Sequence, residues 1–265
     1  KFTVSNGAAL INAGNEAAFE TLMSKEGAAG TDNINLTTQA LTVTGTISNI
    51  NNANNFTAST TGTVTGEIVN TTRVSDLTGL TNAQANAKYT VTLNAADNGT
   101  VTAGQLNRID GGTTEKVDIA NVTTLGASDI SDLVTLNTNN ANFNNITGVA
   151  SITLTDNGGS GTEVDFGTLA DVVDDSQTNF KNTVTFKFQA GDTIDIDDST
   201  ELGKFITDIG DSALTLTDQK VTVDSGTKIS VTNARSIAND TTGTVTASID
   251  TAARVSALTT LYNPG

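Results

Sequence analysis

The sequence predicts a mainly β protein, a repeat-built β-solenoid with short helical corners, and three observations lead to this expectation. The chain holds no Trp, one Met, two Tyr and nine Phe, so its core depends on Val, Ile, Leu and Ala, which suit thin, regular layers. Thr and Asn are abundant; Thr favours extended backbone, and Asn and Gly favour turns. Parts of the sequence also recur. Tandem small β-rich modules are the alternative architecture.

The clearest repeat joins residues 60–80 to residues 241–261. These segments read TTGTVTGEIVNTTRVSDLTGL and TTGTVTASIDTAARVSALTTL, and they are identical at 13 of 21 positions without a gap. Upstream, Ile34–Thr46 matches Leu214–Thr227 with one insertion. We therefore expect an N-terminal module at 1–80, a central β-rich repeat segment at 81–186, and a C-terminal module at 187–265 homologous to the first.

Finer features fill in these modules. The opening Lys1-Phe2 corresponds to Lys187-Phe188. A unit of one strand, one turn and one short helix cannot bury its apolar face alone, so such units are expected to stack. Short helices, most of them opened by a capping Thr, Ser or Asp, are expected at 72–80, 102–109, 128–133 and 253–261.

The charge balance excludes some partners. The chain carries 29 acidic and 13 basic residues, a formal net charge of −16, so its average surface repels polyanions. No apolar run reaches the length of about 18 residues that a membrane-spanning helix needs. We therefore expect no nucleic-acid partner and no membrane span.

Catalysis is not expected either. With no His and no Cys, the chain lacks the commonest general base and all thiol chemistry. Paired carboxylates remain, as in glycosidases, but the aromatic platforms that usually hold sugars are almost missing. The sequence therefore predicts that this protein is not an enzyme.

The acidic segments suggest a cation site. Asp195 and Asp197 alternate with isoleucines in the stretch DTIDIDD, which ends at Asp198, so their carboxylates share one strand face. Like charges there repel unless a cation lies between them, and Ca²⁺ favours carboxylate oxygens. A second acidic stretch, DVVDD, ends at Asp175. A solvated acidic face is the plain alternative.

A glycine-rich segment adds to the calcium prediction. The stretch GGSGTEVDF, from Gly158 to Phe166, resembles the nonapeptide of RTX calcium-binding repeats. Only one copy is present, with Glu163 where that family has Asp and Asp165 where it has a large apolar residue. The resemblance implies an ion near Asp156, Glu163 and Asp165.

Thr-x-Thr pairs recur along the chain, for example Thr42/Thr44, Thr63/Thr65 and Thr244/Thr246. Residues two apart on a strand share a face, so stacked strands would align these hydroxyls into a ladder. Such a ladder resembles the ice-contacting face of β-helical antifreeze proteins. Ordinary alternation of Thr with Val explains the same pattern.

The repeat segments 60–80 and 98–125 look like the Thr/Ala/Asn-rich repeats of very large secreted surface proteins of marine bacteria, particularly cyanobacteria. The resemblance implies a secreted, cell-surface or extracellular location. Because the two ends resemble each other, we expect a structural protein that assembles head to tail with its own copies into a filament, sheath or surface layer. Lys1–Ser5 and Val255–Tyr262 are the surfaces expected to meet. The alternatives are an adhesin or phage-fibre-type module that binds cell-surface polysaccharide, and an ice-binding protein.

Overall fold

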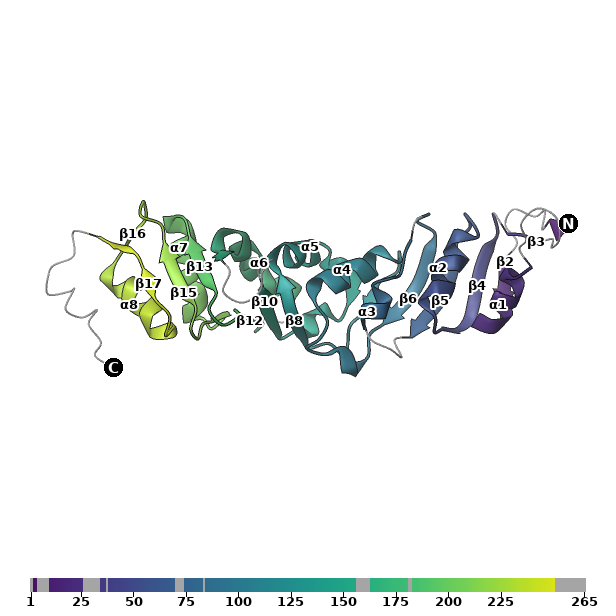
Figure 1. Cartoon of the computed structure of the whole chain (residues 1–265), viewed down its shortest axis with the longest axis horizontal. Coiled ribbons are helices and arrows are strands. Elements are labelled where there is room, and N and C mark those ends of the chain that lie inside the picture. Colours follow the sequence, from purple (N-terminus) through teal and green to yellow (C-terminus); the bar gives the residue numbers. More distant parts are fainter. Residues whose placement is uncertain are drawn as a thin grey trace. The chain divides into compact units, whose positions relative to one another are not determined.

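The chain forms two compact units. Figure 1 labels the helices and strands from which they are built. Unit 1 holds Lys1–Val122 and Asn139–Ile146, and unit 2 holds Thr123–Thr138 and Thr147–Gly265. The boundary falls inside the segment 81–186 that the sequence set apart as a central region. The computed structural model describes residues 2–3, 10–25, 34–36, 38–69, 74–82, 84–155, 163–180 and 183–250.

Unit 1 is built on a six-stranded sheet in the order β2-β4-β5-β6-β7-β9, with every pair parallel. Parallel neighbours need a crossover connection, and helices α1 to α4 provide four of them. Short 3₁₀ turns lie at Ala95–Asp97 and Asn140–Asn142, and a third, Ile146–Gly148, leads into unit 2. The sheet and its helices are β2 Leu10–Ala13, α1 Glu16–Met23, β4 Ala40–Ile47, α2 Ile50–Ala58, β5 Val64–Val69, α3 Val74–Leu77, β6 Ala87–Thr92, α4 Ala103–Gly111, β7 Val117–Asp118 and β9 Phe143–Asn144.

Unit 2 contains two four-stranded parallel sheets, β8-β10-β12-β14 and β11-β13-β15-β17, and a small parallel pair, β16-β18. From β10 to α8, the chain three times adds one strand to each large sheet and then a helix; in the third round β16 precedes the helix. The elements are β8 Thr124–Asp129, α5 Ile130–Thr138, β10 Ser151–Thr155, β11 Glu163–Asp165, α6 Phe166–Asn179, β12 Thr185–Lys187, β13 Thr193–Ile196, α7 Ser199–Gly210, β14 Leu214–Thr215, β15 Lys220–Val223, β16 Lys228–Ile229, α8 Val231–Asp240, β17 Val245–Thr246 and β18 Ser248–Ile249.

The prediction of a mainly β solenoid is therefore wrong. The protein is an α/β fold with parallel sheets, and strands make up only 27% of the chain. Two helices that were not predicted from the sequence are also the longest in the described residues: α6 has 14 residues and α7 has 12. Most strands have two to six residues. The prediction gave too much weight to the β propensity of the abundant Thr and left out the helices that parallel strands require as connections.

Helix starts were better predicted than helix lengths. Thr102 caps α4 as expected: its hydroxyl accepts from the backbone N–H of Gln105, whose side chain accepts in return from the Thr102 N–H. The helix expected at 128–133 begins instead at Ile130 and runs to Thr138. Of the helix expected at 72–80, the structure shows α3, and the helix expected at 253–261 lies outside the described residues.

The core of each unit is aliphatic with a few phenylalanines. Phe19 and Phe56 meet edge to face in unit 1 with ring centroids 4.1 Å apart, and Phe166 and Phe205 do so in unit 2 at 5.1 Å. Tyr89 is fully buried and donates its hydroxyl hydrogen to the carbonyl oxygen of Ala53 at 2.8 Å. In the part of the chain that the structure describes, no helix has the length and apolarity to cross a bilayer.

The sequence repeat gives the same local structure in both units. In unit 1 the hydroxyl of Thr60 donates to the carbonyl oxygen of Gln39 at 2.7 Å and accepts from the N–H of Gly62 at 2.9 Å. In unit 2 the same two bonds, at 2.6 and 2.9 Å, join Thr241 to Gln219 and Gly243. This turn leads into β5 in the first unit and into β17 in the second.

The opening of the chain also has a counterpart. Strand β1 (Phe2–Thr3) pairs in parallel with β3 (Ile34–Asn35), as β12 pairs with β14. Phe2 lies opposite Ile34 and Phe186 lies opposite Leu214, so the register aligns Phe2 with Phe186 rather than with Phe188. The part of Lys1–Ser5 that the structure describes is thus paired within its own chain, and Val255–Tyr262 lies outside the described residues.

The expected Thr ladder does not continue across the described strands. Thr42 lies opposite Thr65, but the next residue in that row is Lys88. In the second unit Thr222 lies opposite Thr246 on one side and opposite Asp195 on the other. These two Thr rows are two strands wide, and the row Thr124-Ser151-Thr185 reaches three strands.

Candidate functional site

The acidic residues singled out by the sequence gather in unit 2, where β11 and β13 end and α6 and α7 begin. Asp165 is the last residue of β11, directly before Phe166 at the start of α6. Asp197 and Asp198 follow β13, and Asp198 is the N-cap of α7. The carboxyl ends of parallel strands meet at one edge of a sheet, which is where α/β proteins usually place their sites.

Like charges oppose each other on the strands that lead to this edge. Asp165 lies directly opposite Asp195 in the parallel register. The pKa of Asp195 is raised, first because the carboxyl group is partly desolvated and then because Glu163, Asp197 and Asp224 are negatively charged neighbours. The expectation of a repelling carboxylate face is thus met at Asp195.

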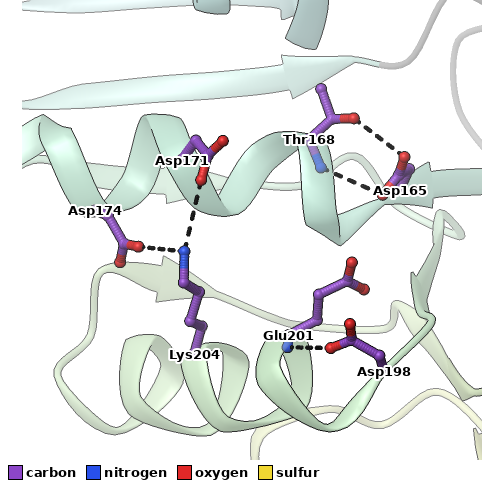
Figure 2. A network of polar contacts seen from close by, with 7 residues as sticks. All are labelled: Asp165, Thr168, Asp171, Asp174, Asp198, Glu201 and Lys204. Atoms are coloured by element: carbon purple, nitrogen blue, oxygen red, sulfur yellow. Dashed lines mark hydrogen bonds and ion pairs between the residues drawn. The ribbon is translucent and has the colours of Figure 1, made fainter.

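The carboxylates at the helix starts are held by backbone N–H groups. Asp198 accepts from the N–H groups of Thr200 and Glu201 at 2.7 and 2.9 Å, and these bonds lower the pKa of its carboxyl group (Figure 2). Glu201 in turn accepts from the N–H of Asp197 at 2.8 Å. Such bonds also place negative charge at the positive end of the helix dipole.

A groove of about 600 Å³ lies over the start of α6, and residues from α5, α6 and α7 line it, among them Val134, Asp165, Thr168 and Glu201. Asp165 accepts from both the N–H and the hydroxyl of Thr168. A Cβ atom at Gly167 would collide with a carboxylate oxygen of Glu201 and lie 3.1 Å from one of Asp165. A larger residue at this position would therefore require the Glu201 side chain to move.

One lysine ties α6 to α7. The ammonium of Lys204 lies 2.6 Å from an oxygen of Asp174 and 3.6 Å from one of Asp171 (Figure 2). Both acidic partners belong to the predicted acidic stretch, which is part of helix α6.

A buried carboxyl group lies on α7, one turn beyond this lysine. The side chain of Asp208 is buried, and one of its oxygens has no hydrogen-bond partner. Burial and, secondarily, the charge of Asp174 raise the pKa of Asp208 to about 6, while Lys204 opposes the rise. The sequence carries one signal for this group: residues 202, 205 and 209 are apolar, so position 208 shares their helix face.

Unit 1 has a carboxylate in the opposite situation. Glu16 on α1 accepts four hydrogen bonds, from the N–H and hydroxyl of Ser48, the N–H of Asn49 and the side-chain amide of Asn52, at 2.8 to 3.1 Å. Partial burial raises the pKa of Glu16, but these hydrogen bonds outweigh it, so the pKa is lowered. This carboxylate anchors α1 to the start of α2.

Five of the six predicted calcium ligands lie at the acidic edge of unit 2: Glu163, Asp165, Asp195, Asp197 and Asp198. Asp156, together with the glycines that resemble the RTX motif, lies outside the described residues.

Within the described ranges, no three acidic side chains are arranged to hold a metal ion. Calcium binding therefore stays a prediction. A thermal melt with calcium and with chelator tests it, and an unchanged midpoint would mean that the cluster is only a solvated acidic face.

Comparison with protein-family models, with curated proteins and with solved structures finds no match. The function has to be argued from the chain itself.

Proposed function

We propose that this protein is an extracellular structural subunit that assembles head to tail with copies of itself. One observation carries the proposal: the same sequence forms an interior strand in unit 1 and an edge strand in unit 2. The two strands are β5 and β17, each preceded by the turn Thr-Thr-Gly-Thr.

Strand β5 has neighbours on both sides. It pairs with β4, and it pairs with β6 over all six of its residues. The amide of Val64 donates to the carbonyl oxygen of Asn86 just before β6, while the carbonyl oxygen of Thr63 accepts from Leu41 of β4.

Strand β17 reproduces one half of this arrangement. The carbonyl oxygen of Thr244 accepts from Val221 of β15 at 3.0 Å, as Thr63 accepts from Leu41. Within the described residues, β15 is the one strand that pairs with β17. By the same geometry, the amide of Val245 is directed away from β15, toward the open edge.

Burial differs accordingly. Val64 and Ile68 are 0% and 1% exposed. Their counterparts Val245 and Ile249 are only half-buried. Among the described residues, β17 thus combines a strand edge that no other strand pairs with and incompletely covered apolar side chains. Such edges bind further strands.

A contact of this kind joins two different surfaces of the same protein. Repetition of a head-to-tail contact that does not close into a ring produces a fibre. The abundance of hydroxyl and amide side chains and the likeness to repeats of bacterial surface proteins support an extracellular location. The hydroxyl rows are short, which gives the ice-binding alternative less support.

The test is the state of the purified protein over a range of concentrations. Light scattering coupled to size-exclusion chromatography should show a mass that rises with concentration, and electron microscopy should show linear particles. A monodisperse monomer at high concentration would remove the proposal.

A further inference from the structure

Each of the two repeats has a second sheet edge, on the side opposite to β5 or β17. A comparison of the repeats shows which strand can occupy this edge. Strand β15 corresponds to β4 by sequence, since it lies inside the segment Leu214–Thr227 that matches Ile34–Thr46. In unit 1, Leu41 of β4 lies opposite Ile11 of β2. In unit 2, Val221 of β15 lies opposite Ile194 of β13 in the same way. Strand β13 is therefore the counterpart of β2.

These two strands differ in what lies on their other side. Strand β13 pairs with β11 through three residues in parallel register. Strand β2, within the described part of unit 1, pairs with β4 alone. Each edge of the module is thus covered in one copy: the edge at β5 by β6, and the edge at β13 by β11.

The geometry points to β2 of a second molecule of this protein as the strand that pairs with the open edge of β17. It is added in parallel, with Ile11 opposite Val245 and Asn12 opposite Thr246. This inference rests on the proposed head-to-tail assembly and adds which strands meet and in which register. It gives each of the two strands the kind of neighbour that its counterpart already has.

Strand order decides in favour of β2 over the other edge of its sheet. In the sheets β2-β4-β5 and β13-β15-β17, each strand lies beside the next one along the chain. A new strand beside β17 continues this order only if the strand that follows it in its own chain lies on its far side, away from β17. Strand β2 meets this condition because β4 follows it, whereas β9 ends its sheet.

The side-chain rows agree with this register. On one face the row Val221-Val245 would continue into Ile11-Leu41, and all four residues are apolar. On the other face Thr246 would lie opposite Asn12, and both side chains are exposed in the single chain. The exposed row at this junction is therefore polar and uncharged.

The corresponding pair inside unit 2 is far less favourable. There β11 places Asp165 opposite Asp195 and Glu163 opposite Thr193. Directly opposed like charges destabilise neighbouring strands. A junction between β17 and β2 has no such repulsion, so it needs no cation to form.

Disulfide trapping tests the register. The chain has no cysteine of its own, so any disulfide must join the introduced cysteines. Directly opposed residues on neighbouring strands have Cα atoms about 4.8 Å apart, within the span of a disulfide. Two variants are made separately, Asn12→Cys and Thr246→Cys, then mixed and oxidised. The matched control mixes Thr246→Cys with Thr65→Cys, which is also exposed and outward but lies on the interior strand β5.

We expect the Asn12→Cys and Thr246→Cys chains to form a disulfide-linked heterodimer at least ten times more abundant than that of the control pair. Each variant should keep the melting temperature of the parent protein, because both positions are exposed. Linear particles without this cross-link would overturn the register and the choice of β2 while leaving the head-to-tail proposal in place. A parent protein that stays monomeric would overturn both.

Discussion

The two copies of the turn and strand TTGTVT share their local structure and differ in their surroundings. Thr60 and Thr241 make the same two hydrogen bonds to the same kinds of partner. Yet Val64 is fully buried between two strands and Val245 is half-buried at an edge. The local sequence thus determines the turn, and the strands that lie beside β5 or β17 determine how much of each strand is buried. The edge copy shows which surface a further strand would cover.

The turn itself gives the largest expected effect. A Cβ atom at Gly62 would collide with the carbonyl oxygen of Gln39, and one at Gly243 with the carbonyl oxygen of Gln219. We expect Gly62→Ala and Gly243→Ala each to lower the free energy of unfolding by about 2–3 kcal/mol, because backbone has to move. Chemical denaturation measures this.

The control for that experiment is Gly203→Ala on α7, where an added Cβ atom meets nothing within 4 Å. This change should be neutral or should stabilise the protein by roughly 0.5–1 kcal/mol. If all three substitutions behaved alike, the shared turn would not be the tightly packed element described above.

Substitutions in the strand after the turn should change the free energy of unfolding by different amounts in the two repeats. Val64→Ala removes a fully buried side chain and should cost about 2 kcal/mol of stability. Val245→Ala removes a half-buried one and should cost less than about 1 kcal/mol in the monomer. Denaturation at low protein concentration measures both, and equal losses would contradict the difference in burial.

The carboxyl groups of Asp208 in unit 2 and Glu16 in unit 1 should affect stability with opposite dependence on pH. Burial raises the pKa of Asp208 to about 6 from 3.8, so its contribution to stability is complete below pH 3.8 and is lost as the pH rises through 6. Asp208→Asn should remove this loss, which we put at roughly 2 kcal/mol. Glu16 has a lowered pKa, so its contribution is lost in the opposite direction, as the pH falls.

Thermal melts between pH 4 and 8 measure the Asp208 effect. Asp171→Asn is the matched control, since its side chain is 87% exposed and lies 3.6 Å from Lys204, whose charge also acts on Asp208. An unaltered pH profile in Asp208→Asn would show that the buried carboxyl group is not responsible.

The sequence predicted the local features of the fold and missed its class. The duplication, the cap at Thr102 and the alternation of inward apolar residues were all readable, because each depends on neighbours in the chain. The long helix α6 was not, because its residues FGTLADVVDD combine a glycine, β-branched valines and clustered acids, which are weak helix formers. Packing against α5 and α7 stabilises that helix, and such packing does not show in composition.

The acidic edge was predicted in part. Alternation with isoleucine placed Asp195 on one strand face correctly, and the register then brought it opposite Asp165. Glu201, Gly167 and Lys204 were missed because they join the cluster through tertiary contacts between helices.

The most direct test of the central claim is Val245→Pro, compared with Val64→Pro. Proline removes the amide that Val64 donates to Asn86, and that Val245 directs toward an incoming strand. We expect Val64→Pro to unfold unit 1, whereas Val245→Pro should leave a folded protein that no longer assembles, as sedimentation velocity at rising concentration would show. Assembly of Val245→Pro at the same concentrations as the parent protein would contradict it.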